Sequence, residues 1–75
     1  MDIKDHHDIF IKRLIEELED QGITQAELAR QLDRRREVIS KWKYQGTFPE
    51  AKTLIRICKV LYVSCDYLLG LSDER

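Results

Sequence analysis

The sequence predicts an all-α domain of five helices, with a helix-turn-helix formed by the second and third. Apolar residues recur at three- and four-residue spacing along most of the chain, as on helices with one buried face. Capping and turn residues separate these segments, and no stretch shows the alternating pattern of a strand. At 75 residues the chain allows one small domain. A domain of this size buries only about 60% of the surface that its unfolded chain exposes.

Residues 1–7 are mostly polar and are predicted to form a flexible tail before the first helix. That helix is expected over about residues 8–21. Its apolar positions repeat along one side: Phe10, Ile11, Leu14, Ile15 and Leu18. Gly22 is well placed to end the helix, because glycine adopts the left-handed conformation at little cost.

The second helix is expected over about residues 25–32. Thr24 can cap it through its hydroxyl, and Glu27 is placed to reach back to the Thr24 amide. Leu28, Ala29 and Leu32 then share one face. Asp33 follows at a sharp turn, where aspartate tolerates the left-handed conformation better than most residues.

The third helix is expected over about residues 36–44 and is amphipathic and basic. Ile39 and Trp42 form its apolar stripe, and we interpret Trp42 as a core anchor rather than a base-stacking residue. From residue 34 to residue 43 the chain carries five positive groups and one negative group. Two short helices joined by a tight turn form a helix-turn-helix, whose second helix can enter the major groove of DNA.

Pro49 is predicted to start the fourth helix, because its missing N–H costs nothing in the first turn. This helix is expected to run to about Leu61 with an inward stripe of Ala51, Leu54, Ile55, Cys58 and Leu61. Ser64 is expected to cap a short fifth helix that Gly70 ends. In that helix Asp66 suits the helix dipole, and Tyr67 and Leu68 can seal the core.

The net charge of −1 is unusual for a protein that binds a polyanion, but the charge is unevenly distributed. Residues 1–22 carry a net −4, residues 23–62 a net +5, and residues 63–75 a net −2. The local field, and not the net charge, steers a polyanion to a surface. The acidic ends should still weaken non-specific DNA binding.

Several function classes find no support in the sequence. No apolar run approaches the ~20 residues that span a bilayer, and the acidic start does not resemble a signal peptide. We interpret Cys58 and Cys65 as reduced thiols of a cytoplasmic protein, because their spacing does not match a zinc site. We interpret the adjacent His6 and His7 as part of a solvated tail, since no third metal ligand is near. No catalytic set is recognisable, so we expect no enzyme, cofactor, metal or small-molecule ligand.

Taken in order, several segments closely resemble the Cro/C1-type helix-turn-helix family, also called the XRE family, of phage and bacterial repressors. They are Thr24–Ala29 (TQAELA), Ile39–Trp42 (ISKW), Pro49, Thr53–Leu54, Val63–Ser64 and Asp66–Gly70 (DYLLG). The resemblance implies a lambda-repressor-like fold over residues 8–72, followed by a C-terminal tail at 73–75. It also implies binding to a near-palindromic operator in double-stranded DNA, commonly as a homodimer.

The chain departs from the family pattern around the turn. Asp33 replaces a common glycine, and Arg34 replaces a common apolar residue. Arg35 stands where serine or threonine usually caps the third helix, a loss of about 1 kcal/mol. Gly46 comes one residue later than usual. These changes add basic charge and leave the pose of the third helix open.

The predicted DNA contacts lie on the second helix, the turn, the third helix and its end: Gln25, Arg34, Arg35, Arg36, Glu37, Ser40, Lys41, Lys43 and Tyr44. Gln25 is expected to donate to a phosphate, and Arg36 to contact a base edge. Arg35 could contact either. Glu37 could accept from cytosine, but pairing with Lys41 four residues on is favoured.

The remaining predicted contacts follow from position along the third helix. Ser40 and Lys41 could reach bases or phosphates, and Arg34, Lys43 and Tyr44 are better placed for phosphates. Near the C-terminus, one apolar set could form a small dimer patch or merely cover the core: Tyr62, Val63, Leu69 and Leu71.

The function that these observations predict is a sequence-specific transcriptional regulator of the repressor type that binds double-stranded DNA. The alternative is a protein-interaction module on the same fold, such as an antitoxin, an anti-repressor or an adaptor. The acidic first helix and acidic ends motivate this alternative.

Overall fold

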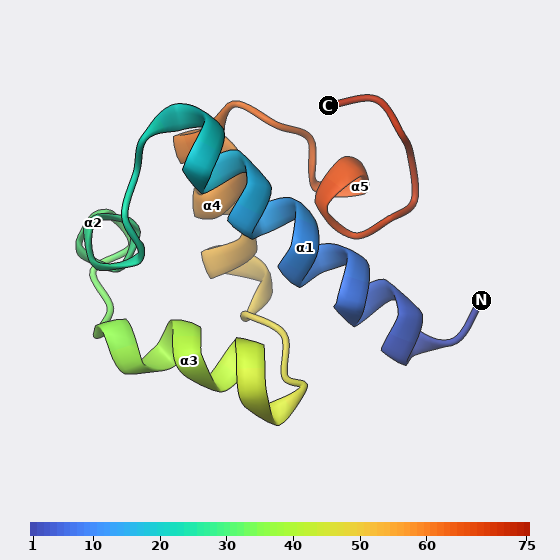
Figure 1. Ribbon diagram of the computed structural model, residues 1–75, viewed down its shortest axis with the longest axis horizontal. Helices are drawn as coiled ribbons and strands as arrows, with labels where there is room; N and C mark the ends of the chain where they lie inside the picture. The colour runs from blue at the N-terminus through green and yellow to red at the C-terminus, as the bar shows by residue number, and fades with distance from the viewer.

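The computed structural model describes all of residues 1–75 and contains five α-helices and no strand, which confirms the predicted fold class. The helices are α1 (Ile3–Gln21), α2 (Gln25–Gln31), α3 (Arg36–Gln45), α4 (Ala51–Leu61) and α5 (Cys65–Leu68). In Figure 1, α1 crosses the front of the molecule, α2 and α3 lie on one side, and α4 lies behind α1. The short α5 packs against both α1 and α4. None of the five helices has the length and apolar character needed to cross a bilayer.

The first helix begins at Ile3 and not near Asp8, so the predicted tail over residues 1–7 is wrong. Asp2 caps the helix, with its side chain accepting from the Ile3 amide at 2.6 Å. The Asp2 amide in turn donates to the Asp5 carboxylate at 3.1 Å, which completes a capping box. These bonds satisfy free amides of the first turn, and His7 continues the buried face of Phe10 one turn earlier.

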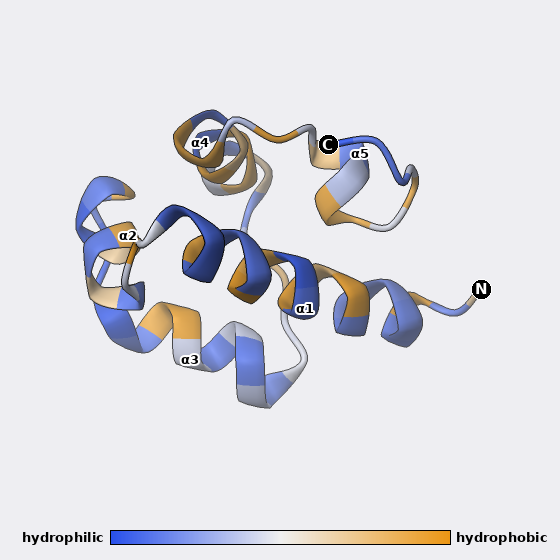
Figure 2. Ribbon diagram, turned by 45° about the horizontal axis from the view of Figure 1, so that its top comes forward, coloured by the Kyte–Doolittle hydropathy of each residue, from blue (hydrophilic) through white to orange (hydrophobic).

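The core draws on all five helices. Its fully buried large side chains are Phe10, Leu14, Leu28, Leu32, Ile39, Ile57, Leu61 and Leu68. Trp42 is 4% exposed, and its ring lies edge-on to Phe10 at a centroid distance of 6.4 Å, so its predicted role as a core anchor is confirmed. Figure 2 shows the same division along α1, which is hydrophilic on one side and hydrophobic on the other.

The fourth helix starts later and buries a different stripe than predicted. Pro49 precedes the N-cap Glu50, and α4 begins at Ala51. Its buried residues are Thr53, Ile57, Cys58 and Leu61, whereas Ala51 and Ile55 are exposed and Leu54 is half-buried. The packing against α1 and α5 sets which side of α4 faces inward, so the predicted inward places of Ala51 and Ile55 are wrong.

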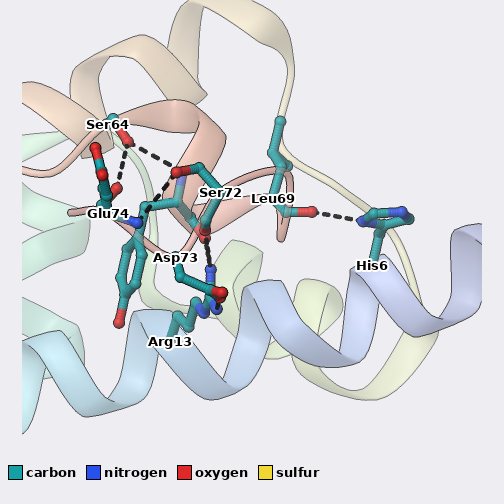
Figure 3. A network of polar contacts seen from close by, with 8 residues as sticks. His6, Arg13, Ser64, Leu69, Ser72, Asp73 and Glu74 are labelled. Atoms are coloured by element: carbon teal, nitrogen blue, oxygen red, sulfur yellow. Dashed lines mark hydrogen bonds and ion pairs between the residues drawn. The ribbon is translucent and has the colours of Figure 1, made fainter. Parts of the chain in front are cut away.

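The C-terminal segment after α5 folds back along α1, although residues 73–75 were predicted to form a tail (Figure 3). Arg13 donates to the carbonyl oxygens of Tyr67 and Ser72 and pairs with Asp73 at 2.9 Å. The Arg13 guanidinium also lies 4.2 Å from the centre of the Tyr67 ring. Closer to the N-terminus of α1, the Nδ1 atom of His6 lies 2.7 Å from the carbonyl oxygen of Leu69.

Candidate nucleic-acid interface

The start of α2 presents a free helix N-terminus. Thr24 caps it as predicted, with its hydroxyl accepting from the Glu27 amide at 3.0 Å. Gln25 lies in the first turn and is half-buried. Peptide dipoles and unpaired amides at such an end favour an anion, and the phosphate contact of Gln25 stays a prediction.

The Glu27 side chain does not complete the predicted capping box with Thr24. Its carboxylate instead accepts from Arg30 and Gln31 in the next turn of α2. Hydrogen bonding to Arg30, and then to Gln31, lowers the pKa of Glu27 below its usual value. The same contact with Glu27 raises the pKa of Arg30.

The turn between α2 and α3 is tight and adopts the conformation expected for it. Asp33 has φ +57°, in the left-handed region, and the Arg34 amide donates to the carbonyl of Ala29 at 2.9 Å. The Arg34 side chain reaches across to α4, where its Nη2 atom lies 3.3 Å from the Glu50 carboxylate. A phosphate contact by Arg34 must therefore compete with Glu50 or share the guanidinium with it.

The third helix turns its apolar side inward and its charged side outward. Ile39 and Trp42 are buried, while Arg35, Arg36 and Lys41 are exposed. Arg35 is the N-cap and makes no side-chain capping bond, as predicted from its sequence. The helix ends at Gln45, and its C-cap Gly46 has a φ of +69°, in the left-handed region that glycine adopts freely.

The remaining predicted contacts spread along the outer side of α3. Glu37 is exposed and forms no ion pair with Lys41, so the favoured pairing is not present. Ser40 is half-buried one turn further on. Tyr44 is 79% exposed, and the Lys43 ammonium lies 5.3 Å from the centre of its ring. The structure thus places both basic and aromatic side chains at the C-terminal end of α3.

A shallow hollow between α2 and the start of α3 brings four arginines together. Its walls include Arg30, Arg34, Arg35 and Arg36. The only carboxylate among them is Asp33. Arg30 is paired with Glu27 and Arg34 with Glu50, so Arg35 and Arg36, which form no ion pair, supply most of the local attraction for a polyanion.

His7 was not predicted from the sequence as a functional residue, but it links α1 to α3 through hydrogen bonds. Its Nε2 atom lies 2.7 Å from the Trp42 carbonyl oxygen and 3.0 Å from the Thr47 carbonyl oxygen. The imidazole ring also stands edge-on to Phe48 at 5.1 Å. The missed signal was the spacing of the N-terminal residues, because Asp2 and Asp5 form a capping pair and His7 stands three residues before Phe10.

The four apolar residues near the C-terminus do not form one patch. Val63 is buried, and Tyr62 is 91% exposed at the left-handed end of α4. Leu69 and Leu71 instead line a separate apolar groove, whose other walls include Ile3 and Leu54. Of the two predicted roles, covering the core fits Val63, which is buried, and Leu69, which packs against the core.

The sequence matches the family model of the Cro/C1-type HTH DNA-binding domain over residues 13–74. This range contains α2, α3, the turn between them and every residue predicted to contact DNA. No curated protein shows significant sequence similarity to the chain.

The fold is similar to that of the P22 c2 repressor protein, solved in complex with synthetic operator 9T in the presence of Tl⁺. The TM-score is 0.75 at 28% sequence identity. The similarity covers 84% of this chain and 96% of the repressor chain.

Proposed function

Because the chain belongs to the Cro/C1-type helix-turn-helix DNA-binding family, we propose that it is a transcriptional regulator of the repressor type that binds double-stranded DNA sequence-specifically. The observation that carries the proposal is the orientation of α3. Its apolar residues Ile39 and Trp42 anchor it to the core, so the exposed Arg35, Arg36 and Lys41 project from a fixed helix. The similar P22 c2 repressor was solved bound to operator DNA, which supports this use of the fold.

In the proposed complex, α3 enters the major groove with its N-terminal end at the base edges. Arg36 reads guanine through its O6 and N7 atoms, and Arg35 reads a base or holds a phosphate. Ser40 and Lys41 follow one turn later on the same helix. Gln25 and the α2 amides bind one phosphate, and Arg34, Lys43 and Tyr44 contact others. No cofactor takes part.

We further propose that two copies bind a near-palindromic operator in the cytoplasm as a homodimer. Two-fold symmetric binding places the two α3 helices about 34–36 Å apart, one turn of the DNA helix. The P22 c2 repressor was solved with an operator, which supports an operator-type site for this chain.

Selection of random duplex DNA by the full chain tests the proposal directly. The enriched sequence is then titrated at several salt concentrations. We expect a two-fold symmetric motif, and a log–log salt slope of about −0.9 for each phosphate neutralised. A selection that enriches no motif would overturn the proposal and favour the protein-interaction module. The exposed acids Glu16, Glu19 and Asp20 on α1 would then be the surface to probe for protein partners.

A further inference from the structure

A second, more enclosed cavity lies between the α2–α3 turn and α4. Its volume is about 220 Å³, and it is lined by Leu32, Asp33, Arg34, Lys52, Thr53 and Arg56. Three of these six residues are cations and one is a carboxylate, so positive charge dominates the walls. Of these residues only Arg34 was among the DNA contacts predicted from the sequence.

Two weak contacts hold the arginines beside the cavity and leave most of their donors free. The Nη2 atom of Arg34 lies 3.3 Å from the Glu50 carboxylate, and the Nη1 atom of Arg56 donates to the Leu32 carbonyl at 3.4 Å. A guanidinium carries five N–H donors, so each arginine keeps several for another acceptor. Lys52 is exposed and forms no ion pair.

Thr53 adds a neutral donor to this wall. The residue is only 4% exposed and lines the cavity, whereas the buried side-chain atom without a hydrogen-bond partner in this chain is Oε1 of Glu17. Because Thr53 lines the cavity, its hydroxyl can donate to a group that enters it.

We infer that this cavity binds a phosphate group through Arg34, Lys52, Thr53 and Arg56. Guanidinium groups match phosphate oxygens through paired N–H donors, and the ammonium adds a compact charge. The small volume suits a single phosphate group. Arg34 also lines the arginine-rich hollow beside α3, so the two cationic surfaces meet at this residue.

Two sources can supply the phosphate: the backbone of bound DNA, or a free molecule that carries a phosphate group. The DNA source rests on the proposed function, whereas the free source does not. A salt titration of DNA binding separates the two, because only a contact with the DNA backbone contributes to the counterion release on binding.

The first test titrates the full chain with inorganic phosphate, with sodium chloride at the same ionic strength as reference, and follows amide and arginine side-chain NMR signals. We expect saturable shifts at Thr53 and Arg56 that chloride does not produce. The double variant Lys52→Gln/Arg56→Gln should abolish them. Lys59→Gln, an exposed charge on α4 outside the cavity, should leave them unchanged. Thr53→Val should weaken the binding, and Thr53→Ser should restore it if the hydroxyl is the donor.

The second test measures the salt dependence of binding to the selected DNA site. If the DNA backbone supplies the phosphate, the double variant reduces the magnitude of the log–log slope by about 0.9, and Lys59→Gln leaves it unchanged. If a free molecule supplies the phosphate, the double variant keeps the slope of the wild type and loses only the NMR shifts that inorganic phosphate produces. The inference is overturned if phosphate produces only the NMR shifts that chloride produces and the double variant also leaves the slope unchanged. Sequence-selective binding that persists in that case would leave the proposed function intact.

Discussion

The Nε2 atom of His7 lies 2.7 Å from the backbone oxygen of Trp42, a residue 35 positions later in the chain. The same nitrogen is 3.0 Å from the Thr47 oxygen. Because both partners are carbonyl oxygens, this nitrogen must carry the proton and share it between them. One buried side chain of α1 thereby holds both the C-terminal half of α3 and the loop that follows it.

We predict that His7→Ala destabilises the fold by about 1–3 kcal/mol, because it leaves two carbonyls without their donor. It should also weaken DNA binding beyond the loss caused by unfolding, since α3 loses its tie to α1. His7→Gln keeps an N–H donor at a similar reach and should recover much of both losses. Urea unfolding and titration of the selected DNA site measure the two effects. Equal losses in the alanine and glutamine variants would contradict a role for the hydrogen bonds.

Replacement of Arg36 by alanine should relax the DNA sequence preference at one base position. A good bidentate contact with guanine is worth about 1–3 kcal/mol of discrimination. The measurement is a repeat of the selection with the variant, followed by titration of sites changed at one position. Lys59→Ala removes the same charge from an exposed position on α4 and should leave the preference unchanged. An unaltered motif with Arg36→Ala would count against the proposed readout.

Arg35 at the N-cap of α3 should lower the stability of the fold and strengthen DNA binding. Arg35 has φ −77° and ψ +150°, which is the conformation of an N-cap, but its side chain caps nothing. Arg35→Ser should therefore raise the free energy of unfolding by about 0.5–2 kcal/mol. The same change removes a cation from the DNA face and should weaken binding at low salt. A variant that gains no stability, as measured by thermal unfolding, would show that serine does not cap this helix.

Glu17 is a buried carboxylate of α1 whose cationic partner is Arg75. The Glu17 side chain is 4% exposed, and its Oε1 atom lies 3.2 Å from Arg75 without hydrogen-bond alignment. Arg75→Ala should destabilise the fold, because the buried charge would lose this partner. In the background of Glu17→Gln the same substitution should cost much less, since the amide carries no charge. A double-mutant cycle by urea unfolding measures this difference, and equal costs in both backgrounds would contradict the pairing.

The thiol of Cys58 should make stability fall at high pH. Burial, and then hydrogen bonding to Cys65, raises the pKa of Cys58 from 9.0 to about 12. The unfolded chain therefore loses this proton at lower pH than the folded chain. The stabilisation is complete below pH 9 and is lost progressively as the pH rises toward 12. Other groups titrate in this range, so the measurement is the difference in unfolding free energy between the wild type and Cys58→Ala. A difference that does not change with pH would contradict the prediction.

Features that depend on neighbours along the chain were predictable from the sequence. The number of helices follows from apolar spacing. The caps at Thr24 and Ser64 and the left-handed turns at Gly22 and Asp33 follow from local side-chain chemistry. The buried side of α3 was also predictable, because Ile39 and Trp42 leave only one apolar stripe on that helix. All these features arise from interactions within a few residues along the chain.

Which groups meet across the fold depends on how the helices pack and was not predictable from local spacing. His7 is a polar residue in a polar segment, and only the position of α3 makes it a buried donor. Thr53 faces the cavity, and Ile55 faces solvent, because the neighbouring helices and not the pattern of α4 set which side is buried. The pairing of Glu17 with Arg75 joins the first helix to the last residue of the chain. In each of these cases, local spacing determines that a helix has a buried face, but only packing determines what lies opposite that face.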